Sequence, residues 1–245
     1  MTSCGEYQSL LKSNDYNLVY KKAIEYYNKG DYQRAMNLLD GVRSVFVGQA
    51  KAQNIAYYRA FCSYNMKDYQ IASDLFKQFI QTYPESSFAE ECLYMMGFCD
   101  YKASPKPRLD QQVTEKAIRE FQLYLSRYPY SMRKDKVNTY MDEMRDKLSY
   151  KAYLSAKNYY LREHYKAAVI SLQNCLKDYP GSKYREEIMY MLFVSKYQMA
   201  VNSVEDKKVE RYNNAREEYY YFADEYPNSR YAADVKKMYE DIEAY

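Results

Sequence analysis

A single helical pattern occurs five times along this chain and constrains its fold more than any other feature. Each copy begins at an alanine, has a large side chain four positions later and reaches an aromatic residue eleven positions later; the alanines are Ala35, Ala72, Ala117, Ala168 and Ala215. These offsets place the side chains on one face of an α-helix. In four copies a proline follows the aromatic residue, and proline disfavours helical geometry in the residue before it. Five copies of one helix with a common stop signal predict an array of helical repeats.

A second helix is expected before each copy of this pattern. In four copies a tyrosine lies three residues before the alanine, and in four a small residue lies twelve before it. This phasing resembles the tetratricopeptide repeat, a hairpin of two helices. The resemblance implies an all-α fold, a right-handed α-solenoid of five tetratricopeptide-like hairpins with a C-terminal capping helix. We expect one repeat domain over residues 16–245, with repeats near 16–47, 49–84, 86–129, 131–180 and 182–227 and a cap at 229–245.

The spacing between successive alanines is 37, 45, 51 and 47 residues, and each irregularity predicts a local structure. Pro105 and Pro107 predict an exposed loop in the third hairpin, and a stretch without breakers predicts one long helix over residues 132–162. Residues 202–211 are expected to form a charged link, and residues 230–244 a solvent-facing last helix. A serine two residues after each proline is expected to cap the next helix, so Tyr-Pro-x-Ser is interpreted as a structural device.

Charge, hydropathy and motifs argue against several classes of function. The 36 basic and 33 acidic residues are interspersed and give a net charge of +3, which does not indicate nucleic-acid binding. The sequence has no run of 18 apolar residues, so no transmembrane helix is predicted. The one histidine, His164, lies in a turn sequence, and no phosphate-loop, metalloprotease or nucleophile-elbow motif occurs. We therefore expect no enzyme activity, no catalytic residue, no metal site and no cofactor. The glutamate pairs are interpreted as solvated faces or first-turn charges, namely Glu90/Glu91, Glu186/Glu187 and Glu217/Glu218.

The cysteines fall into two groups. Four lie in helical patterns and are interpreted as buried free thiols, with a disulfide left open if the compartment is oxidising, namely Cys62, Cys92, Cys99 and Cys175. The segment Thr2-Ser3-Cys4-Gly5 instead resembles the end of a bacterial lipobox, in which the cysteine carries the lipid. Residues 1–15 would then be a tether to a membrane surface, with its upstream signal regions missing here. An incidental cysteine in a disordered start is the alternative.

Taken in order, these irregularities resemble the BamD family of outer-membrane β-barrel assembly lipoproteins. The resemblance is carried by residues 20–35, by Tyr94-Met95-Met96-Gly97-Phe98, by the insertion at 104–112 and by Arg127-Tyr128-Pro129-Tyr130-Ser131. The first repeat departs from the pattern, because Phe46-Val47-Gly48 replaces Tyr-Pro and leaves the junction to repeat two undefined. The family implies a non-enzymatic protein, lipid-anchored at the periplasmic face of the outer membrane. Its implied partners are BamA, other subunits of the assembly machinery and unfolded outer-membrane proteins.

The resemblance also implies that the N-terminal repeats contact substrate and the C-terminal repeats contact BamA. Tyrosines of the first helices could line a groove for an extended peptide, namely Tyr20, Tyr27, Tyr57, Tyr58 and Tyr64. Packing within the hairpins is the alternative interpretation of these residues. The candidates for partner contact are cationic, namely Lys196, Lys207, Lys208, Arg211 and Arg216. Two other functions stay open: a tetratricopeptide scaffold elsewhere in the cell envelope, and a soluble adaptor that binds a partner peptide.

Overall fold

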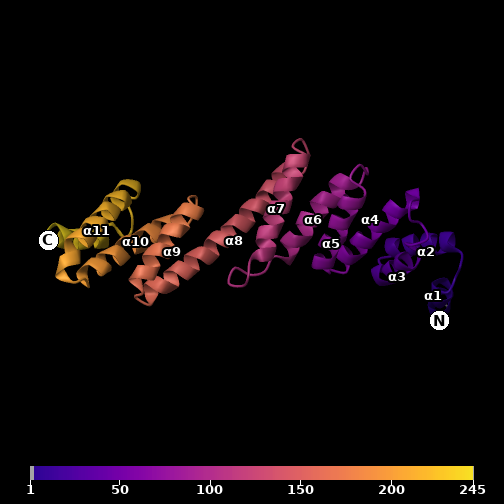
Figure 1. The fold of residues 1–245 in the computed structure, drawn as a ribbon, viewed down its shortest axis with the longest axis horizontal. Coiled ribbons are helices and arrows are strands. Elements are labelled where there is room, and N and C mark those ends of the chain that lie inside the picture. Colours follow the sequence, from indigo (N-terminus) through magenta and orange to yellow (C-terminus); the bar gives the residue numbers. More distant parts are fainter. Residues whose placement is uncertain (1–2, 245) are drawn as a thin grey trace. The chain divides into compact units, whose positions relative to one another are not determined.

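The computed structural model describes the backbone of residues 3–244 and the side chains of residues 5–244. Within these residues the regular elements are all helices, and neighbouring helices pair as hairpins (Figure 1). The helices are α1 (Ser3–Leu11), α2 (Tyr16–Asn28), α3 (Tyr32–Val42), α4 (Ala50–Asn65), α5 (Tyr69–Thr82), α6 (Ala89–Ala103), α7 (Gln112–Arg127), α8 (Lys134–Leu161), α9 (Tyr165–Asp178), α10 (Arg185–Val201), α11 (Glu205–Glu225) and α12 (Ala232–Glu243). The predicted all-α repeat fold is confirmed.

The chain forms two compact units, and the boundary between Met144 and Arg145 falls inside α8. The first unit holds α1, the hairpins α2–α3, α4–α5 and α6–α7, and the start of α8. The second holds the rest of α8 with α9, the hairpin α10–α11, and α12. That residues 16–245 act as one repeat domain stays a prediction.

The irregular spacings correspond to real features of the structure, with one exception. The long helix is α8, of 28 residues, and the proline-containing loop separates α6 from α7. The charged link predicted at 202–211 is wrong for most of its length, because α11 already begins at Glu205. Glu205 and Asp206 lie in the first turn of α11, where negative charge interacts favourably with the helix dipole. No glycine or proline interrupts the segment, so the helix extends through it.

The N-terminal segment also differs from the expected tether. Residues 3–11 form α1, and its side chains Tyr7 and Leu10 are buried. Asn37 of α3 donates a hydrogen bond to the Tyr7 hydroxyl at 3.0 Å, and the Arg34 guanidinium lies 5.3 Å from the centre of the Tyr7 ring. The side chain of Cys4 lies outside the described residues. From Gly5 onward, this segment packs on the first repeat as a helix.

The serines of Tyr-Pro-x-Ser join successive repeats. Each serine lies three residues before its helix and accepts a hydrogen bond from the N–H two residues on, at 2.9–3.3 Å. Each hydroxyl also bonds a side chain of the preceding repeat; the pairs are Ser86–Gln53, Ser131–Glu90, Ser182–Ser149 and Ser229–Glu186, at 2.9, 2.7, 2.8 and 2.6 Å. The serine therefore shapes the turn before the helix and links two repeats, which is more than the predicted cap.

The first junction keeps the same backbone turn without proline or serine. The N–H of Gln49 donates to the carbonyl oxygen of Phe46 at 3.0 Å, and the equivalent bond from Ser86 to Tyr83 is 3.1 Å. Gly48 has a φ of 76° here, a left-handed conformation that glycine adopts without steric cost. Gly48 thus shapes this junction, which has neither the proline nor the serine of the other four.

The turns inside three hairpins share one left-handed residue. Gly30, Lys67 and Glu163 lie at equivalent places and have φ values of 81°, 68° and 59°. Only the first of these turns uses glycine, and a residue with a Cβ in this conformation is strained by about 1 kcal/mol or more.

We therefore expect Lys67→Gly and Glu163→Gly each to raise the free energy of unfolding by about 0.5–1 kcal/mol. Both side chains are exposed, so little packing is lost. Urea denaturation followed by circular dichroism would measure the change, with Gly30→Ala as a control of opposite sign. Destabilisation by both glycine variants would contradict the strain argument.

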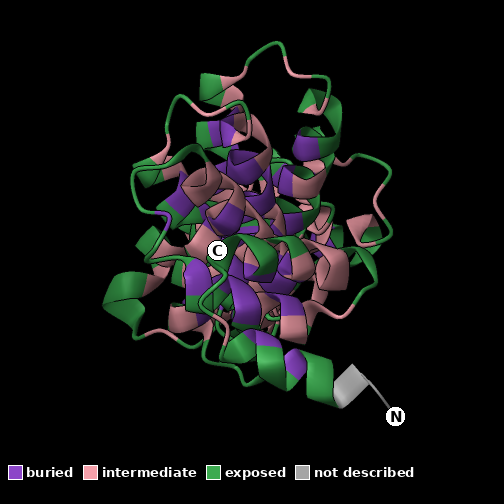
Figure 2. Ribbon diagram, turned by 90° about the vertical axis from the view of Figure 1, so that its right-hand side faces the viewer, coloured by how far each residue is buried: buried purple, intermediate pink, exposed green. Residues whose placement is uncertain are grey.

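Buried residues gather on the helix faces that meet one another, and the connecting loops are exposed (Figure 2). The four helical cysteines are buried free thiols, as predicted. Burial, and then the charge of Asp40, raises the pKa of Cys62 to about 12, and burial with the nearby Glu91 does the same for Cys92. These thiols are protonated at neutral pH and act as small apolar side chains.

Candidate peptide-binding face

The first helix of each hairpin carries two tyrosines seven residues apart, and equivalent tyrosines of the five hairpins are grouped by sequence position into two rows. The first tyrosine row consists of Tyr20, Tyr57, Tyr94, Tyr153 and Tyr190. The second tyrosine row consists of Tyr27, Tyr64, Tyr101, Tyr160 and Tyr197. A small residue lies between the two in the first four hairpins, namely Ala23, Ala60, Gly97 and Ala156. All four are buried, so the two rows flank the contact between the helices of a hairpin.

The first tyrosine row packs against the start of the next repeat. Ring centres of Tyr57 and Phe88 are 4.6 Å apart, those of Tyr153 and Tyr184 are 4.3 Å apart and those of Tyr190 and Tyr231 are 4.1 Å apart. At the other two junctions a cation replaces the ring. Arg133 lies 4.5 Å from the centre of Tyr94, and Lys51 lies 5.6 Å from that of Tyr20. Such contacts contribute about 0.5–1.5 kcal/mol each, so this row stabilises the stacking of repeats.

The second tyrosine row places hydroxyl groups toward polar partners. Asn65 donates to the Tyr27 hydroxyl at 3.4 Å, while Tyr101 donates to Glu143 at 2.5 Å. Tyr197 donates to Asp241 at 2.8 Å. Each of these bonds joins a tyrosine to a helix of the following repeat, or to α12, within the same unit.

Four of the five predicted groove tyrosines form one aromatic cluster. The ring centre of Tyr58 lies 4.9 Å from that of Tyr27 and 5.6 Å from that of Tyr57. Phe61 continues the cluster to Tyr64, at 4.5 Å from Tyr57 and 6.4 Å from Tyr64. The fifth, Tyr20, packs on Phe46 at 6.1 Å and hydrogen-bonds Asn54. The structure therefore brings the predicted residues to adjoining positions on α2 and α4.

These tyrosines combine packing with partial exposure. All five are half-buried, which agrees in part with the alternative that they pack the hairpins. Burial raises the pKa of Tyr27 and of Tyr57 to about 12. Both phenols are therefore neutral at physiological pH and can donate or accept a hydrogen bond. The face offers aromatic surface with neutral polar tips, which suits an extended peptide carrying apolar side chains.

The predicted partner-contact cations are already engaged within the chain, except for one. Lys196 of α10 forms an ion pair with Glu218 of α11 at 2.6 Å, and the two side chains are only 15% and 14% exposed. Lys208 pairs with Glu205 at 3.0 Å.

The two predicted arginines of α11 hold carbonyl or side-chain oxygens. Arg211 donates to the Ser203 hydroxyl at 2.6 Å and to the Met199 carbonyl at 3.2 Å. Arg216 donates to Asn213 at 2.9 Å. Lys207 is exposed and has no ion pair with another described residue, so it is the best placed of the five for an outside partner.

A pocket next to these cations was not predicted. It has a volume of about 590 Å³ and lies between the turn before α9 and the end of α10, with Ile170, Met199 and Arg211 among its lining residues. The Ile170 side chain is 55% exposed and does not contribute to the core. The only indication of this pocket in the sequence is Ile170, an apolar residue at an outward position of α9. Helical periodicity alone does not connect such a residue with a pocket.

Of the two interpretations given for the glutamate pairs, that of a solvated face is wrong for Glu91 and Glu187. Glu91 accepts from Arg133 at 2.9 Å, so it bonds the following repeat. Glu187 accepts from Lys157 at 2.7 Å and from the Tyr153 hydroxyl at 2.9 Å, so it bonds the preceding one. These acids lie in the first turns of α6 and α10, as the dipole argument expected, but their carboxylates join repeats.

The described residues also show what the site does not contain. They include no group of three or more metal-ligating side chains. None of their helices has the length and apolar character needed to cross a membrane.

Comparison with known proteins places the chain in a family. The model of the YfiO family, described as outer membrane lipoprotein, matches residues 12–187 and 151–244. The search of curated proteins gave no significant match. Among solved structures, the TPR2AB-domain:pHSP90 complex of yeast Sti1 is 14% identical, with 93% of this chain and 98% of that chain covered and a TM-score of 0.42. A TPR repeats protein from Bacteroides fragilis is 13% identical, with coverages of 95% and 99% and a TM-score of 0.44. Because the family model spans nearly the whole chain, the protein belongs to the YfiO (BamD) family of outer membrane lipoproteins.

Proposed function

We propose that the protein is a non-enzymatic scaffold of outer-membrane β-barrel assembly, anchored by a lipid on Cys4 at the periplasmic face. The observation that carries this proposal is the family match over residues 12–244. A stack of helix hairpins presents extended faces to other proteins, which is consistent with a scaffold. The partners proposed are BamA, further subunits of the assembly machinery and unfolded outer-membrane proteins.

The aromatic cluster on α2 and α4 is the proposed receiving face for unfolded substrates. Barrel strands alternate apolar and polar side chains, so an unfolded strand carries apolar side chains on one side and backbone polar groups along its length. The cluster of Tyr27, Tyr57 and Tyr58 offers ring faces for the former and neutral hydroxyls for the latter. Contact through many weak aromatic sites tolerates different substrate sequences.

A photocrosslinker tests this face directly. With benzoylphenylalanine at position 58, we expect a crosslink to an unfolded outer-membrane barrel protein added from denaturant. The same group at Tyr221, a tyrosine of α11 that is 65% exposed, should give at most about a tenth of that yield if the rings on α4 are the recognition element. Equal yields at both positions would show that exposure alone determines the crosslink.

The second unit is the proposed contact for BamA, with Lys207 as its first residue to test. We expect BamA to co-purify with the intact lipoprotein from solubilised outer membranes. Reversal of one rim charge, Lys207→Glu, should lower recovery by roughly fivefold. Lys177→Glu, an equally exposed lysine of α9, serves as the matched control. Absence of BamA from the unmodified complex would remove the assembly role and leave a scaffold of another kind.

The lipid anchor needs its own measurement. Mass spectrometry of the mature protein from membranes should show acyl chains on Cys4. Since α1 packs on α3 through Tyr7 and Leu10, a lipid at Cys4 would hold the first repeat close to the membrane surface. An unmodified Cys4 in a cytosolic protein would support the soluble adaptor instead.

A further inference from the structure

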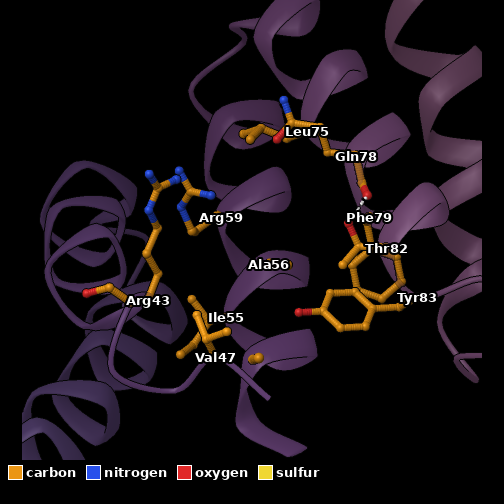
Figure 3. Close-up of a pocket in the computed structure, with 12 residues that line it drawn as sticks. Arg43, Val47, Ile55, Ala56, Arg59, Leu75, Gln78, Phe79, Thr82 and Tyr83 are labelled. Atoms are coloured by element: carbon orange, nitrogen blue, oxygen red, sulfur yellow. Dashed lines mark hydrogen bonds between the residues drawn. The ribbon is translucent and has the colours of Figure 1, made fainter. Parts of the chain in front are cut away.

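A pocket between the first two hairpins has a chemical character that the proposed function does not use. It has a volume of about 480 Å³, within the range of roughly 300–1,000 Å³ usual for small-molecule sites. The pocket lies beside the ends of α3 and α5 and against α4 (Figure 3). We propose that it binds an anionic amphiphile, a molecule with one acidic head group and a single acyl or alkyl chain.

The pocket lies where the first repeat departs from the others. Helix α3 ends at Val42, seven residues after its alanine, whereas α5, α7, α9 and α11 each end ten residues after theirs. The residues that would extend α3 form turns, and Val47 there is 76% exposed. Val47 lines the pocket together with residues of α4 and α5. The missing turn of helix therefore uncovers apolar surface that the helix would otherwise cover.

The walls of the pocket are largely apolar. Ile55 and Phe79, both 1% exposed, line it together with Ala56, Leu75 and the ring of Tyr83. A chain of methylene groups in contact with these side chains would be removed from water, which is the main driving force for binding an apolar ligand.

Both charged residues that line the pocket are arginines, Arg43 and Arg59. Figure 3 shows their side chains on the same side of the pocket, opposite Phe79 and Tyr83. Arg59 bonds Asp40 at 2.6–2.7 Å, and its side chain is only 14% exposed. Arg43 forms no ion pair with any other described residue. A guanidinium without an acid partner beside apolar walls is complementary to a carboxylate or a phosphate that carries an alkyl chain.

The experiment uses the full chain and decanoate below its micellar concentration, followed by calorimetry and by methyl NMR. We expect saturable one-to-one binding that shifts the methyl signals of Val47, Ile55 and Leu75. Decyl phosphate should bind as well or better, because its head group is also anionic. Decanol and decyltrimethylammonium should bind at least about tenfold more weakly, because a neutral head loses the pairing with Arg43 and a cationic head is repelled.

Variants separate this pocket from general surface binding. Arg43→Ala should weaken decanoate binding by about tenfold and leave decanol binding unchanged. Ala56→Phe fills the space and should weaken every alkyl ligand, while thermal unfolding verifies that the variant is folded. Arg119→Ala, an exposed arginine of α7, should change nothing.

Three results would overturn the proposal. The first is equal affinity for decanoate, decanol and the cationic analogue. The second is decanoate binding that survives Arg43→Ala. The third is an acetylated tripeptide, with a free apolar C-terminal residue, that shifts the same methyl signals and binds more tightly than decanoate. The last result would identify a peptide pocket. Since decanoate binding involves neither BamA nor barrel substrates, failure here leaves the proposed assembly role unaffected.

Discussion

Replacing Glu120 by glutamine is expected to stabilise the protein at alkaline pH and to flatten its pH dependence of stability. Glu120 of α7 lies in a buried cluster with Asp100 of α6 and Ser73 of α5. Burial, and then hydrogen bonding and repulsion from Asp100, raises the pKa of Glu120 to about 8, against the lowering effect of Lys116. The carboxyl is therefore largely protonated at neutral pH, and ionisation would place a second negative charge beside Asp100.

The geometry explains why one lysine does not relieve the repulsion. Lys116 lies 2.8 Å from Asp100 but 3.7 Å from Glu120, and its side chain is 36% exposed. Ser73 donates its hydroxyl proton to Asp100 at 3.0 Å. The second oxygen of Glu120, Oε2, is buried without a hydrogen-bond partner among the described residues. Asp100 thus has more hydrogen-bond donors than Glu120. Asp100 is therefore the carboxylate that stays ionised, and Glu120 is the one that keeps its proton.

The folded state holds the Glu120 proton more tightly than the unfolded chain, so the free energy of unfolding falls as pH rises from about 4.5 to about 8. Below this window both states are protonated and above it both are ionised, so the contribution is constant outside it. The slope is at most about 1.4 kcal/mol per pH unit. Urea denaturation at about pH 5.5, 7 and 8.5 would measure it, and Glu120→Gln should lose most of the slope.

Repeat five supplies the control for this prediction. Glu218 occupies the position of Glu120, three residues after the repeat alanine, and Lys196 occupies the position of Asp100. There the acid has a cation at 2.6 Å in place of a second acid. Glu218→Gln should therefore destabilise the protein at neutral pH, by about 1–3 kcal/mol, because it leaves a mostly buried lysine without its ion pair. Glutamine variants with the same sign at both positions would contradict the assignment.

The fold could be predicted because its determinants are local in sequence. The alanine pattern fixes one helix face, and the proline fixes where that helix ends, so five hairpins follow without knowledge of distant contacts. Leu39, Phe76, Phe121 and Leu172 of that face are each completely buried. The long helix α8 was equally predictable, since it requires only that no breaker occurs.

Errors arose where a residue's role depends on another repeat. Glu91 and Glu187 have the sequence environment of surface helix residues, and only stacking brings Arg133 and Lys157 to them. Lys196 is a related case within one hairpin, because its partner Glu218 lies on α11, 22 residues away along the chain. The early end of α3 is a further case, since no proline marks it. The pocket beside Arg43 was therefore invisible to reasoning from periodicity.

The groove tyrosines lie between these cases. The seven-residue spacing of Tyr57 and Tyr64 identifies the helix face that carries them. The sequence could also place Tyr58 on the same helix and Tyr27 on a neighbouring one. It could not divide each ring between packing and recognition, because Phe88 and Phe61 reach Tyr57 only after the hairpins stack. These rings are half-buried, so each packs within the repeats and also remains partly accessible. Their role in recognising a peptide stays a proposal.

Gly97→Ala is expected to destabilise the protein although alanine favours helices. Gly97 lies inside α6 where the first, second and fourth hairpins have Ala23, Ala60 and Ala156. A Cβ added there would come within 2.9–3.0 Å of two ring atoms of Phe121. That ring is completely buried in α7 and cannot move without disturbing the core. Overpacking of this kind costs about 1–3 kcal/mol, which exceeds the roughly 0.5–1 kcal/mol that alanine gains over glycine in a helix.

Gly41 provides the matched control, because it also lies in a helix but a Cβ there would meet nothing within 4 Å. Gly41→Ala should raise the free energy of unfolding by about 0.5–1 kcal/mol through helix propensity alone. The two identical substitutions should therefore differ in sign when measured by urea denaturation. The double variant Gly97→Ala/Phe121→Leu removes the clashing ring atoms and should show less than the sum of its single effects, since the two residues are in contact. Strict additivity would mean that the glycine is not required by the Phe121 ring and that the close approach of α6 and α7 has another cause.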